Sequence, residues 1–316
     1  MGQCARYAVL RRGTLVTDRA ISADHLDPAT RQLLDLSPAQ RIASIDRDLW
    51  IGYGRALEAH ERLERILGSE RRMRPDNLLI VGASNNGKTA IARRFLSRHV
   101  LPEDPAAEWA TIPVALLQAP NGPKVSLLLG SILHALGREP GRRTTTAQLR
   151  HEAYAAIRDV GLRLLLIDDL HNIRGSGIGS VLVELRNLGS VTGVSLGCLA
   201  TKEIAYVLRQ DEQLANRFDL MTLPRWQLDD LDYAKLLATL EQQLPLRRPS
   251  GLTDLPLAEH ILVAADGLIG GIASILRQAA IAAIRSSHER IDRSNLPSGP
   301  DLSPQRIETL AQMPDL

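Results

Sequence analysis

The sequence predicts an α/β fold in which a parallel five-stranded sheet, flanked by helices, is followed by a small all-helical domain. Apolar runs of strand length alternate with helical segments, and they lie at residues 77–82, 112–119, 163–169, 193–200 and, shorter, 220–224. Continuous apolar strands separated by helices are typical of a parallel sheet that is covered on both faces. After residue 224 the strand pattern stops, and helical periodicity follows at residues 229–243, 256–266 and 270–287.

These patterns divide the chain into four parts. Residues 1–46 form an N-terminal extension with short helices, and residues 47–224 form the α/β core. Residues 225–290 form a helical domain that we expect to act as a lid on the core. Residues 291–316 form a proline-containing tail, which we expect to be loosely held apart from a short helix at 303–312.

Composition excludes several classes of protein. The chain has 38 basic and 36 acidic residues, and a net charge of +2 is too small to coat nucleic acid through bulk charge alone, so any DNA contact must come from local patches. The two cysteines, Cys4 and Cys198, fit neither a disulfide framework nor metal-site spacing, which indicates a reducing compartment. No apolar stretch reaches the length of a signal peptide or of a membrane span, about 18 residues. We therefore expect a cytoplasmic protein with no membrane partner.

The loop after the first apolar run carries the clearest chemical signal. It reads Gly82, Ala83, Ser84, Asn85, Asn86, Gly87, Lys88, Thr89, which fits the pattern G-x-x-x-x-G-K-[ST]. Backbone N–H groups at the start of the following helix form an anion nest, Lys88 would reach the β and γ phosphates, and the Thr89 hydroxyl would bind Mg²⁺. The alternative is a glycine turn that caps an ordinary helix, and the strand before the loop and the helix after it disfavour that alternative. The pattern predicts ATP and Mg²⁺ as cofactors.

A pair of acids ends the third apolar run, in "LLLIDDLHN". The run would deliver Asp168 and Asp169 to the carboxyl edge of the sheet, where ligands bind in open α/β folds. One carboxylate, Asp168, can order the magnesium shell, and the other, Asp169, can polarise a water for attack on the γ phosphate. Acids often begin a loop for other reasons, so this pair gains its meaning from the phosphate loop. Together the two motifs predict an ATPase.

Taken in order, several stretches resemble the TniB family. They are the phosphate loop in "NLLIVGASNNGKT", the acidic strand "LLLIDDLHN", the preface "SPAQRIASIDRDLWIGYGRA", and "LANRFDLMTLPRW", "LPLRRPS" and "GLIGGIASILRQAAIAAIR". TniB is the AAA+ ATPase subunit of a group of DDE transposons and is related to the TnsC-type and MuB-type target-selection ATPases. The resemblance extends from about residue 20 to residue 290. It implies an AAA+ core with a helical lid.

The resemblance also implies roles for individual residues. Residues 82–89 would be the Walker A loop, and Asp168 and Asp169 the Walker B pair. Thr201, in "LATKEI", matches the polar sensor that orients the attacking water, although a helix N-cap is the simpler explanation. Arg217, in "NRF", matches an arginine finger that reaches a neighbouring subunit's nucleotide, although an arginine at such a position is otherwise commonplace.

The preface would contribute to the nucleotide site as well. Trp50, Ile51 and Tyr53 resemble the segment that lies against the adenine in this superfamily, and simple core packing is the alternative for Trp50. Two positions depart from the family pattern. Asp169 stands where relatives carry glutamate, which could slow hydrolysis by misaligning the water. Gly270 stands where wider AAA+ proteins place a lid arginine, which puts a lid sensor in doubt.

The resemblance implies a function in choosing DNA targets. ATP-bound subunits would stack into a homo-oligomer, a ring or helical filament, around double-stranded DNA, and would recruit or activate a DDE transposase, with a TniQ-like adaptor as a further partner. Hydrolysis would release the interface and clear the DNA. Lys124 and the pair Arg142 and Arg143 are candidates for contacts with the phosphate backbone, and solvated loop charges are the alternative for all three.

Three other functions remain open on the sequence. One is a nucleotide-gated scaffold, in which Asp169 makes hydrolysis negligible and the ATP-bound form binds a protein partner. Another is an AAA+ helper of replication initiation or helicase loading, since those proteins share the core motifs. The third is a small P-loop kinase, which the absence of an obvious lid for an acceptor substrate disfavours.

Overall fold

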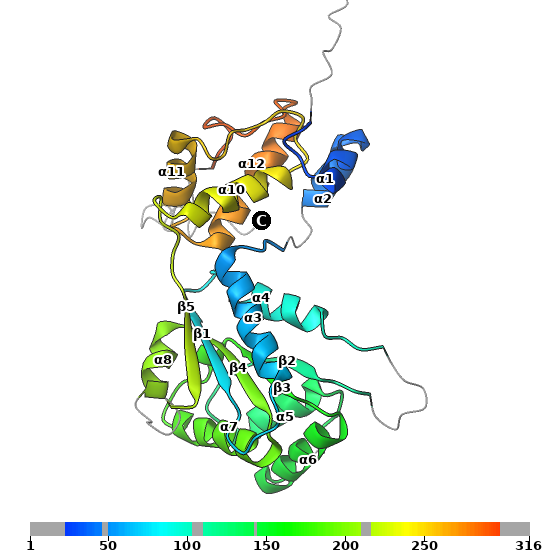
Figure 1. The fold of residues 1–316 in the computed structure, drawn as a ribbon, viewed down its shortest axis with the longest axis vertical. Coiled ribbons are helices and arrows are strands. Elements are labelled where there is room, and N and C mark those ends of the chain that lie inside the picture. Colours follow the sequence, from blue (N-terminus) through cyan, green and yellow to red (C-terminus); the bar gives the residue numbers. More distant parts are fainter. Residues whose placement is uncertain (1–22, 46–49, 103–109, 142–143, 210–215, 298–316) are drawn as a thin grey trace, which may run out of the picture.

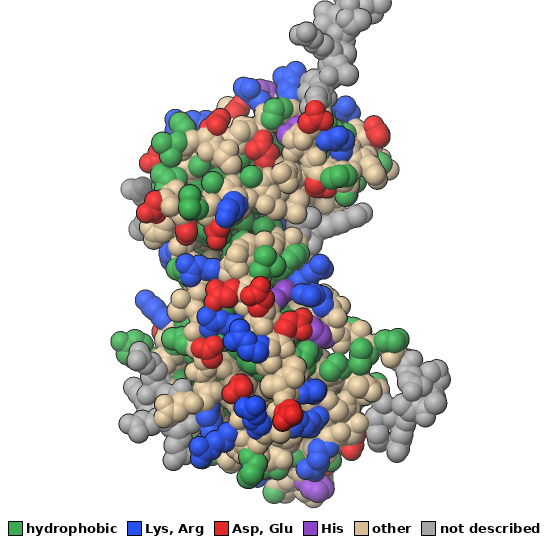
Figure 2. All heavy atoms as spheres, in the orientation of Figure 1, with side chains coloured by type: hydrophobic (Ala, Val, Ile, Leu, Met, Phe, Trp, Pro, Cys, Tyr) green, Lys and Arg blue, Asp and Glu red, His purple; other side chains and the backbone are tan. Residues whose placement is uncertain are grey.

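The computed structural model describes residues 23–45, 50–102, 110–141, 144–209 and 216–297. They form an α/β part and a smaller helical part, which meet at a narrower waist (Figures 1 and 2). The helical part lies beyond the C-terminal end of β5, at the carboxyl ends of the strands (Figure 1). A site at those ends therefore lies between the two parts.

The α/β part contains a five-stranded parallel sheet, as predicted. Its strands are β1 (Asn77–Gly82), β2 (Val114–Gln118), β3 (Leu164–Asp168), β4 (Ser195–Ala200) and β5 (Phe218–Leu223), in the spatial order β2-β3-β4-β1-β5. Every neighbouring pair is parallel, with Gln118 opposite Asp168 and Gly82 opposite Leu223. All carboxyl ends therefore lie at one edge, where parallel α/β sheets bind ligands.

Helices cover both faces of the sheet. They are α3 (Gly54–Gly68), α4 (Lys88–Ser97), α5 (Val125–Ala135), α6 (Thr146–Asp159), α7 (Ile178–Thr192) and α8 (Lys202–Arg209). Because successive strand residues point to opposite faces, Leu78 and Ile80 of β1 pack in the cluster with α3 and α4, whereas Leu79 packs in the cluster with α5, α6 and α7. Two hydrophobic cores thus fix the sheet between helical layers.

Local sequence signals define several helix ends. Thr145 and Gln148 form a reciprocal capping box at the start of α6, with Gln148 N–H donating to Thr145 Oγ1 and Thr145 N–H donating to Gln148 Oε1. Helix α7 ends at Gly193, whose φ of 70° is the left-handed conformation that glycine adopts without strain. These signals hold α6 and α7 in the layer that backs the strand with the acidic pair.

The helical part consists of the predicted C-terminal helices. They are α10 (Leu231–Gln242), α11 (Leu255–Ala264) and α12 (Ile269–Arg285), and they share a third hydrophobic cluster that also includes Trp226. Among the described residues, no single helix has the length and hydrophobicity to cross a bilayer; α11 and α12 qualify only as a pair, bent by 115° at the break between them. Both helices contribute buried side chains to the lid cluster.

Segments from both ends of the chain complete this lid. Helices α1 (Pro28–Gln32) and α2 (Pro38–Ile45) lie beside it (Figure 1), and Ile45 is buried in its cluster. Arg41, of which 2% is exposed, forms a two-pronged ion pair with Glu289, at 2.8 and 2.6 Å. Leu296, in the expected tail, is also buried there. The described parts of the two flanking segments thus pack into the lid, while the expected helix at 303–312 lies outside the described residues.

We predict that Arg41→Ala destabilises the lid by about 2–3 kcal/mol, because it leaves the Pro245 carbonyl without this partner and leaves the Glu289 carboxylate with Arg247 alone. Denaturant unfolding would measure the loss. Lys235→Ala, which removes an exposed ion pair with Asp232, is the control and should change stability little. Equal stability of the two variants would contradict a role for Arg41.

We also predict that this contribution depends on pH. Burial alone would raise the pKa of Glu289, but hydrogen bonds from Arg41 and the Arg247 amide, with the charges of both arginines, lower it below its ordinary value. The stabilisation should be complete above the ordinary glutamate pKa of about 4.3 and should be lost as the pH falls through the lowered value. Unfolding of wild type and Arg41→Ala from pH 7 down to about 3 should show their difference shrinking.

Candidate nucleotide-binding site

The phosphate loop connects the end of β1 to the start of α4. Asn85 and Gly87 both have positive φ, at 59° and 81°. Left-handed residues within such a turn direct successive backbone N–H groups into one concavity, which binds anions. At Gly87 a side chain would also lie 3.2 Å from Ile269 Cγ2, so glycine serves both the conformation and the close approach of the lid.

Lys88 lies inside this loop. Its side chain is buried, and Nζ donates to the carbonyl oxygens of Gly82, at 3.0 Å, and Ala83, at 2.7 Å. Burial lowers the pKa of Lys88, while the negative charges of Asp168 and Asp169 act in the opposite direction. We expect phosphate oxygens to replace the two carbonyls as acceptors, since a charged acceptor makes the stronger hydrogen bond.

The acidic pair lies at the end of β3, as predicted. Asp168 is buried, and its Oδ1 accepts a hydrogen bond from the backbone N–H of Asp169, at 2.9 Å. Asp169 lines the cleft in the left-handed conformation, with φ of 52°. Aspartate tolerates this conformation better than longer side chains do, because its short carboxylate can bond locally. The backbone thus offers a physical reason for aspartate at this position.

Two residues that the sequence analysis missed lie on either side of Asp169. Gln118 Nε2 donates to Asp169 Oδ2 at 3.3 Å, and His171 Nδ1 lies 3.9 Å from Asp169 Oδ1. Gln118 reaches the acid because it ends β2 opposite Asp168. The sequence signals were a polar residue near the end of the run at 112–119 and a histidine two positions after Asp169. With the charge of Lys88, these two side chains contribute to the surroundings of the Asp169 carboxylate.

The donor atoms suit a magnesium ion. Thr89, in the first turn of α4, lines the cleft, and the Asp168 carboxylate lies close enough to raise the pKa of Lys88 through its charge. Hydroxyl and carboxylate oxygens are the hard ligands that Mg²⁺ takes in nucleotide sites, with phosphates and waters completing its shell. When bound, the ion would neutralise charge on the phosphates; the residues that would hold it are Thr89 and Asp168.

A cleft of about 800 Å³ joins these groups to the lid. On the core side it is lined by residues 84–91 of the loop and α4 and by Asp169, and on the lid side by Ile269, Gly270, Ala273, Ser274 and Arg277 of α12. Clefts of this size are typical of sites for ligands as large as a nucleotide. The lid is therefore one wall of the site.

The preface contributes side chains to the wall of the cleft, and its contact with adenine stays a prediction. Trp50, Ile51 and Tyr53 all lie on its wall. The Trp50 ring also stacks on His60 of α3, with centroids 4.9 Å apart and an interplanar angle of 3°, so it both packs and faces the cleft. Burial raises the pKa of Tyr53 to about 12, and the phenol is neutral at physiological pH. An apolar, aromatic wall suits an adenine base.

Thr201 lies between β4 and α8, at the same edge of the sheet. Strand β4 separates the strand with the acids from the strand with the phosphate loop, so Thr201 lies between the two motifs. Its side chain hydrogen bonds with Glu203, which lowers the pKa of that exposed carboxyl. Its carbonyl accepts the first helical bond of α8, from Ala205, at 3.4 Å. The sensor and N-cap interpretations are both compatible with this position.

Arg217 lies at the amino ends of the strands, away from the carboxyl ends where the phosphate loop lies. It immediately precedes β5, and Asn77, at the start of β1, donates its side-chain N–H to the Arg217 carbonyl at 3.1 Å. The Arg217 guanidinium donates to Ser190 Oγ at 2.9 Å. Asn77, which contacts Arg217, lies five residue steps before Gly82 at the start of the phosphate loop, about 16 Å along β1. Arg217 cannot reach the nucleotide of its own subunit.

The lid presents an arginine that the sequence analysis missed. Gly270, where a lid arginine was expected from wider relatives, lies against Asn85 of the phosphate loop. Arg277, two turns further along the same face of α12, lines the cleft and is half-buried. Arg93 and Arg94 of α4 line the cleft from the core side. These cations, with Lys88, make the cleft attractive to an anionic ligand.

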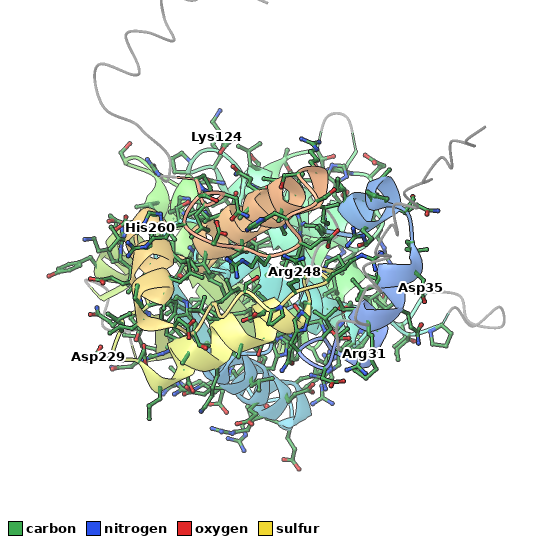
Figure 3. The ribbon with its side chains drawn as sticks, turned by 90° about the horizontal axis from the view of Figure 1, so that it is seen from above. Arg31, Asp35, Lys124, Asp229, Arg248 and His260 are labelled. Atoms are coloured by element: carbon green, nitrogen blue, oxygen red, sulfur yellow. The ribbon has the colours of Figure 1, made fainter. Side chains whose placement is uncertain are left out.

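Lys124, the candidate DNA contact that the structure describes, does not line the cleft. Lys124 is exposed at the N-cap of α5 and lies near the rim in the view from above (Figure 3). Arg142 and Arg143 lie outside the described residues. Acidic and basic side chains are interspersed on the face drawn in Figure 2, as the small net charge requires.

Comparison with known proteins identifies the family. The family model described as bacterial TniB protein matches residues 41–228, more than half of the 316 residues. The chain belongs to the TniB family. TniB proteins are P-loop ATPases of transposition, so the expected family and its AAA+ ATPase class are confirmed. No curated protein matches the chain.

Solved structures share the AAA+ fold of this TniB protein. The Aeropyrum pernix ORC1 protein, in complex with DNA, is 18% identical, with a TM-score of 0.56 over 80% of this chain and 67% of that chain. Cdc6p from Pyrobaculum aerophilum is 15% identical, with a TM-score of 0.57 over 86% of this chain and 74% of that one. The Aeropyrum pernix ORC2 protein, solved as ADPNP and ADP complexes, is 16% identical, with a TM-score of 0.55 over 81% and 70%.

We predict that Asp169→Asn lowers the rate of ATP hydrolysis about 100-fold or more while it changes ATP affinity less than threefold, because it would remove only the carboxylate that we expect to polarise the attacking water. Asparagine also tolerates the left-handed backbone, so the change isolates the charge. Turnover and equilibrium nucleotide binding would be measured together.

Asp266→Asn is the matched control for that variant. Asp266 also has positive φ, at 53°, but it lies in an exposed lid turn, so turnover should be unchanged. Hydrolysis by Asp169→Asn at the wild-type rate would contradict the role of Asp169.

Proposed function

We propose that this TniB protein binds ATP and Mg²⁺, oligomerises on double-stranded DNA as a ring or helical filament, and recruits or activates a DDE transposase at the target site, with a TniQ-like adaptor as a further partner. ATP hydrolysis would drive disassembly. The observation that carries the proposal is the cleft that the phosphate loop and the lid form together in a chain of this family. A nucleotide bound in this cleft would contact both the core and the lid, and it could hold them in the one relative arrangement that assembles.

The position of Arg217 supports an assembly in which subunits complete each other's sites. Since this arginine lies about 16 Å along β1 from its own phosphate loop, any action on a nucleotide must be on that of a neighbouring subunit. Its present partner, the Ser190 hydroxyl, is neutral, so a phosphate could displace it at little cost. The γ phosphate of ATP would then form a contact between two subunits, and hydrolysis would remove that contact.

Two alternatives have specific observations in their favour. The left-handed backbone at Asp169 accepts the shorter acid, which favours a hydrolysis-poor scaffold gated by nucleotide. The likeness to ORC1 and Cdc6p favours a helper of replication initiation or helicase loading. Turnover with and without DNA separates the ATPase from the scaffold, and the partner that the assembled form binds separates transposition from replication.

Electron microscopy of the purified protein with linear duplex DNA tests the assembly, with ATP, ADP and no nucleotide compared at one salt concentration. We predict regular rings or filaments with ATP only. Lys88→Ala should assemble under none of these conditions, because the phosphates lose their cation. Normal oligomers in that variant would contradict the account of the phosphate loop, and dispersed wild-type particles in all three conditions would favour the scaffold.

Arg217→Ala tests the contact between subunits. It should bind nucleotide within about threefold of wild type but fail to oligomerise, and its turnover should fall at least tenfold, since a transition-state charge is left uncompensated. Arg158→Ala, which changes an exposed arginine of α6, is the control and should behave as wild type. Unchanged turnover in Arg217→Ala would remove the assignment.

Lys124→Ala tests the DNA contact. Loss of one phosphate contact should weaken binding similarly for all duplex sequences and reduce the slope of log K against log salt by about 1. Fluorescence anisotropy with a labelled duplex, repeated at several salt concentrations with ATP present, would measure both quantities. An unaltered affinity and salt slope would exclude Lys124 from the interface.

A further inference from the structure

The phosphate loop and the lid are joined through Asn86. This side chain is 3% exposed, and its Nδ2 donates to the carbonyl oxygens of Leu223, at 2.8 Å, and Pro224, at 3.1 Å. Leu223 ends β5, and Pro224 begins the connection to the lid. The residue in the middle of the phosphate loop thus binds the segment that carries the lid.

The loop also binds the lid itself, at the first turn of α12. The carbonyl of Asn85 accepts from Gly270 N–H at 3.1 Å, and Asn86 Oδ1 accepts from Ile269 N–H at 3.5 Å. The first N–H groups of a helix have no partner within the helix, and here the phosphate loop supplies acceptors for two of them. The loop therefore caps α12.

The start of α12 and the phosphate loop are in close contact at Gly270. A Cβ at Gly270 would lie 2.0 Å from Asn85 Oδ1 and 2.5 Å from its Cγ. Gly267, just before α12, accepts a hydrogen bond from Trp226 N–H at 2.8 Å, so the connection after β5 and the start of α12 are tied to each other as well. Gly270 occupies the position where wider AAA+ proteins place a lid arginine, and in this structure that position lies in close contact with Asn85.

We propose that Asn86 is a positioning residue that couples the shape of the phosphate loop to the orientation of the lid. Lys88 donates hydrogen bonds to the carbonyls of Gly82 and Ala83 in the same loop. Phosphates that draw Lys88 away from these carbonyls would change the conformation of the loop, and this loop binds the start of α12. The lid then follows the loop through Asn85 and Asn86. The biological use of this coupling rests on the proposed ATP-dependent assembly, but the coupling itself needs only nucleotide binding.

Hydrogen–deuterium exchange of residues 267–276 tests the coupling, without nucleotide and with Mg²⁺ and ADPNP. In the wild type we expect exchange at the start of α12 to change on nucleotide addition. Without nucleotide, Asn86→Ala should raise exchange there about tenfold, because the side-chain hydrogen bonds with Leu223, Pro224 and Ile269 are lost, and nucleotide should no longer alter it. Wild-type exchange in Asn86→Ala, both without and with nucleotide, would overturn the proposal.

Asn295→Ala is the matched control. Asn295 makes two hydrogen bonds between its side chain and the backbone in the lid, with Arg290 and Asp292, compared with three for Asn86, and they lie outside the contact with the loop. This variant should leave exchange at residues 267–276 unchanged. The same increase in both variants would show general loosening of the lid and would overturn the specific role of Asn86.

A compensating pair tests the contact if Asn86→Ala fails to fold. Gly270→Ala should raise exchange at the start of α12, because its methyl meets the Asn85 side chain. Asn85→Gly removes that side chain at a position with φ of 59°, where glycine is unstrained, and should restore exchange in the double variant. Effects that simply add, without recovery, would overturn the contact. If the wild type binds no ADPNP, the proposed function is refuted. The contact between Asn86 and the lid is still tested in that case, because exchange without nucleotide is measured separately.

Discussion

The parallel register of the five strands is the constraint on which the nucleotide cleft depends. Because every strand runs in the same direction, the phosphate loop after β1, the acids after β3 and Thr201 after β4 emerge at one edge. A slip of one residue in β3 would turn Leu165 and Ile167 from one hydrophobic core toward the other and move the acids with them. Burial on both faces prevents such a slip, so core packing also fixes the positions of the residues predicted to bind and hydrolyse the nucleotide.

Much of the fold was predictable because buried parallel strands appear in the sequence as continuous apolar runs. The observed strands lie within two residues of the predicted ends, and the lid helices follow the helical periodicity. The packing of α2 on the lid was not predictable. Arg41 is a charged residue on a short helix, and its partner, Glu289, is 248 positions away, so no local pattern records that both become buried.

The site divides in the same way. The phosphate loop and the acidic pair are contiguous motifs, and they were found where local spacing predicts them. Gln118, His171 and Arg277 act only through tertiary proximity, so sequence spacing could not connect them with Asp169 or with the nucleotide. Gly270 was interpreted as the loss of an arginine, whereas the structure relates it to a close contact with Asn85. The roles of Thr201 and Arg217 stay predictions.

The construction of the lid from both ends of the chain has a consequence for synthesis. Helix α2 leaves the ribosome early, but Glu289, which neutralises Arg41, is made only after the whole α/β core. The core can fold as it emerges, since its sheet and covering helices are contiguous in sequence. The cleft, in contrast, gains its lid wall only when α12 is complete. A chain made only as far as the core would expose its phosphate loop without a lid, so the proposed nucleotide-dependent assembly would have to wait for the synthesis of α12.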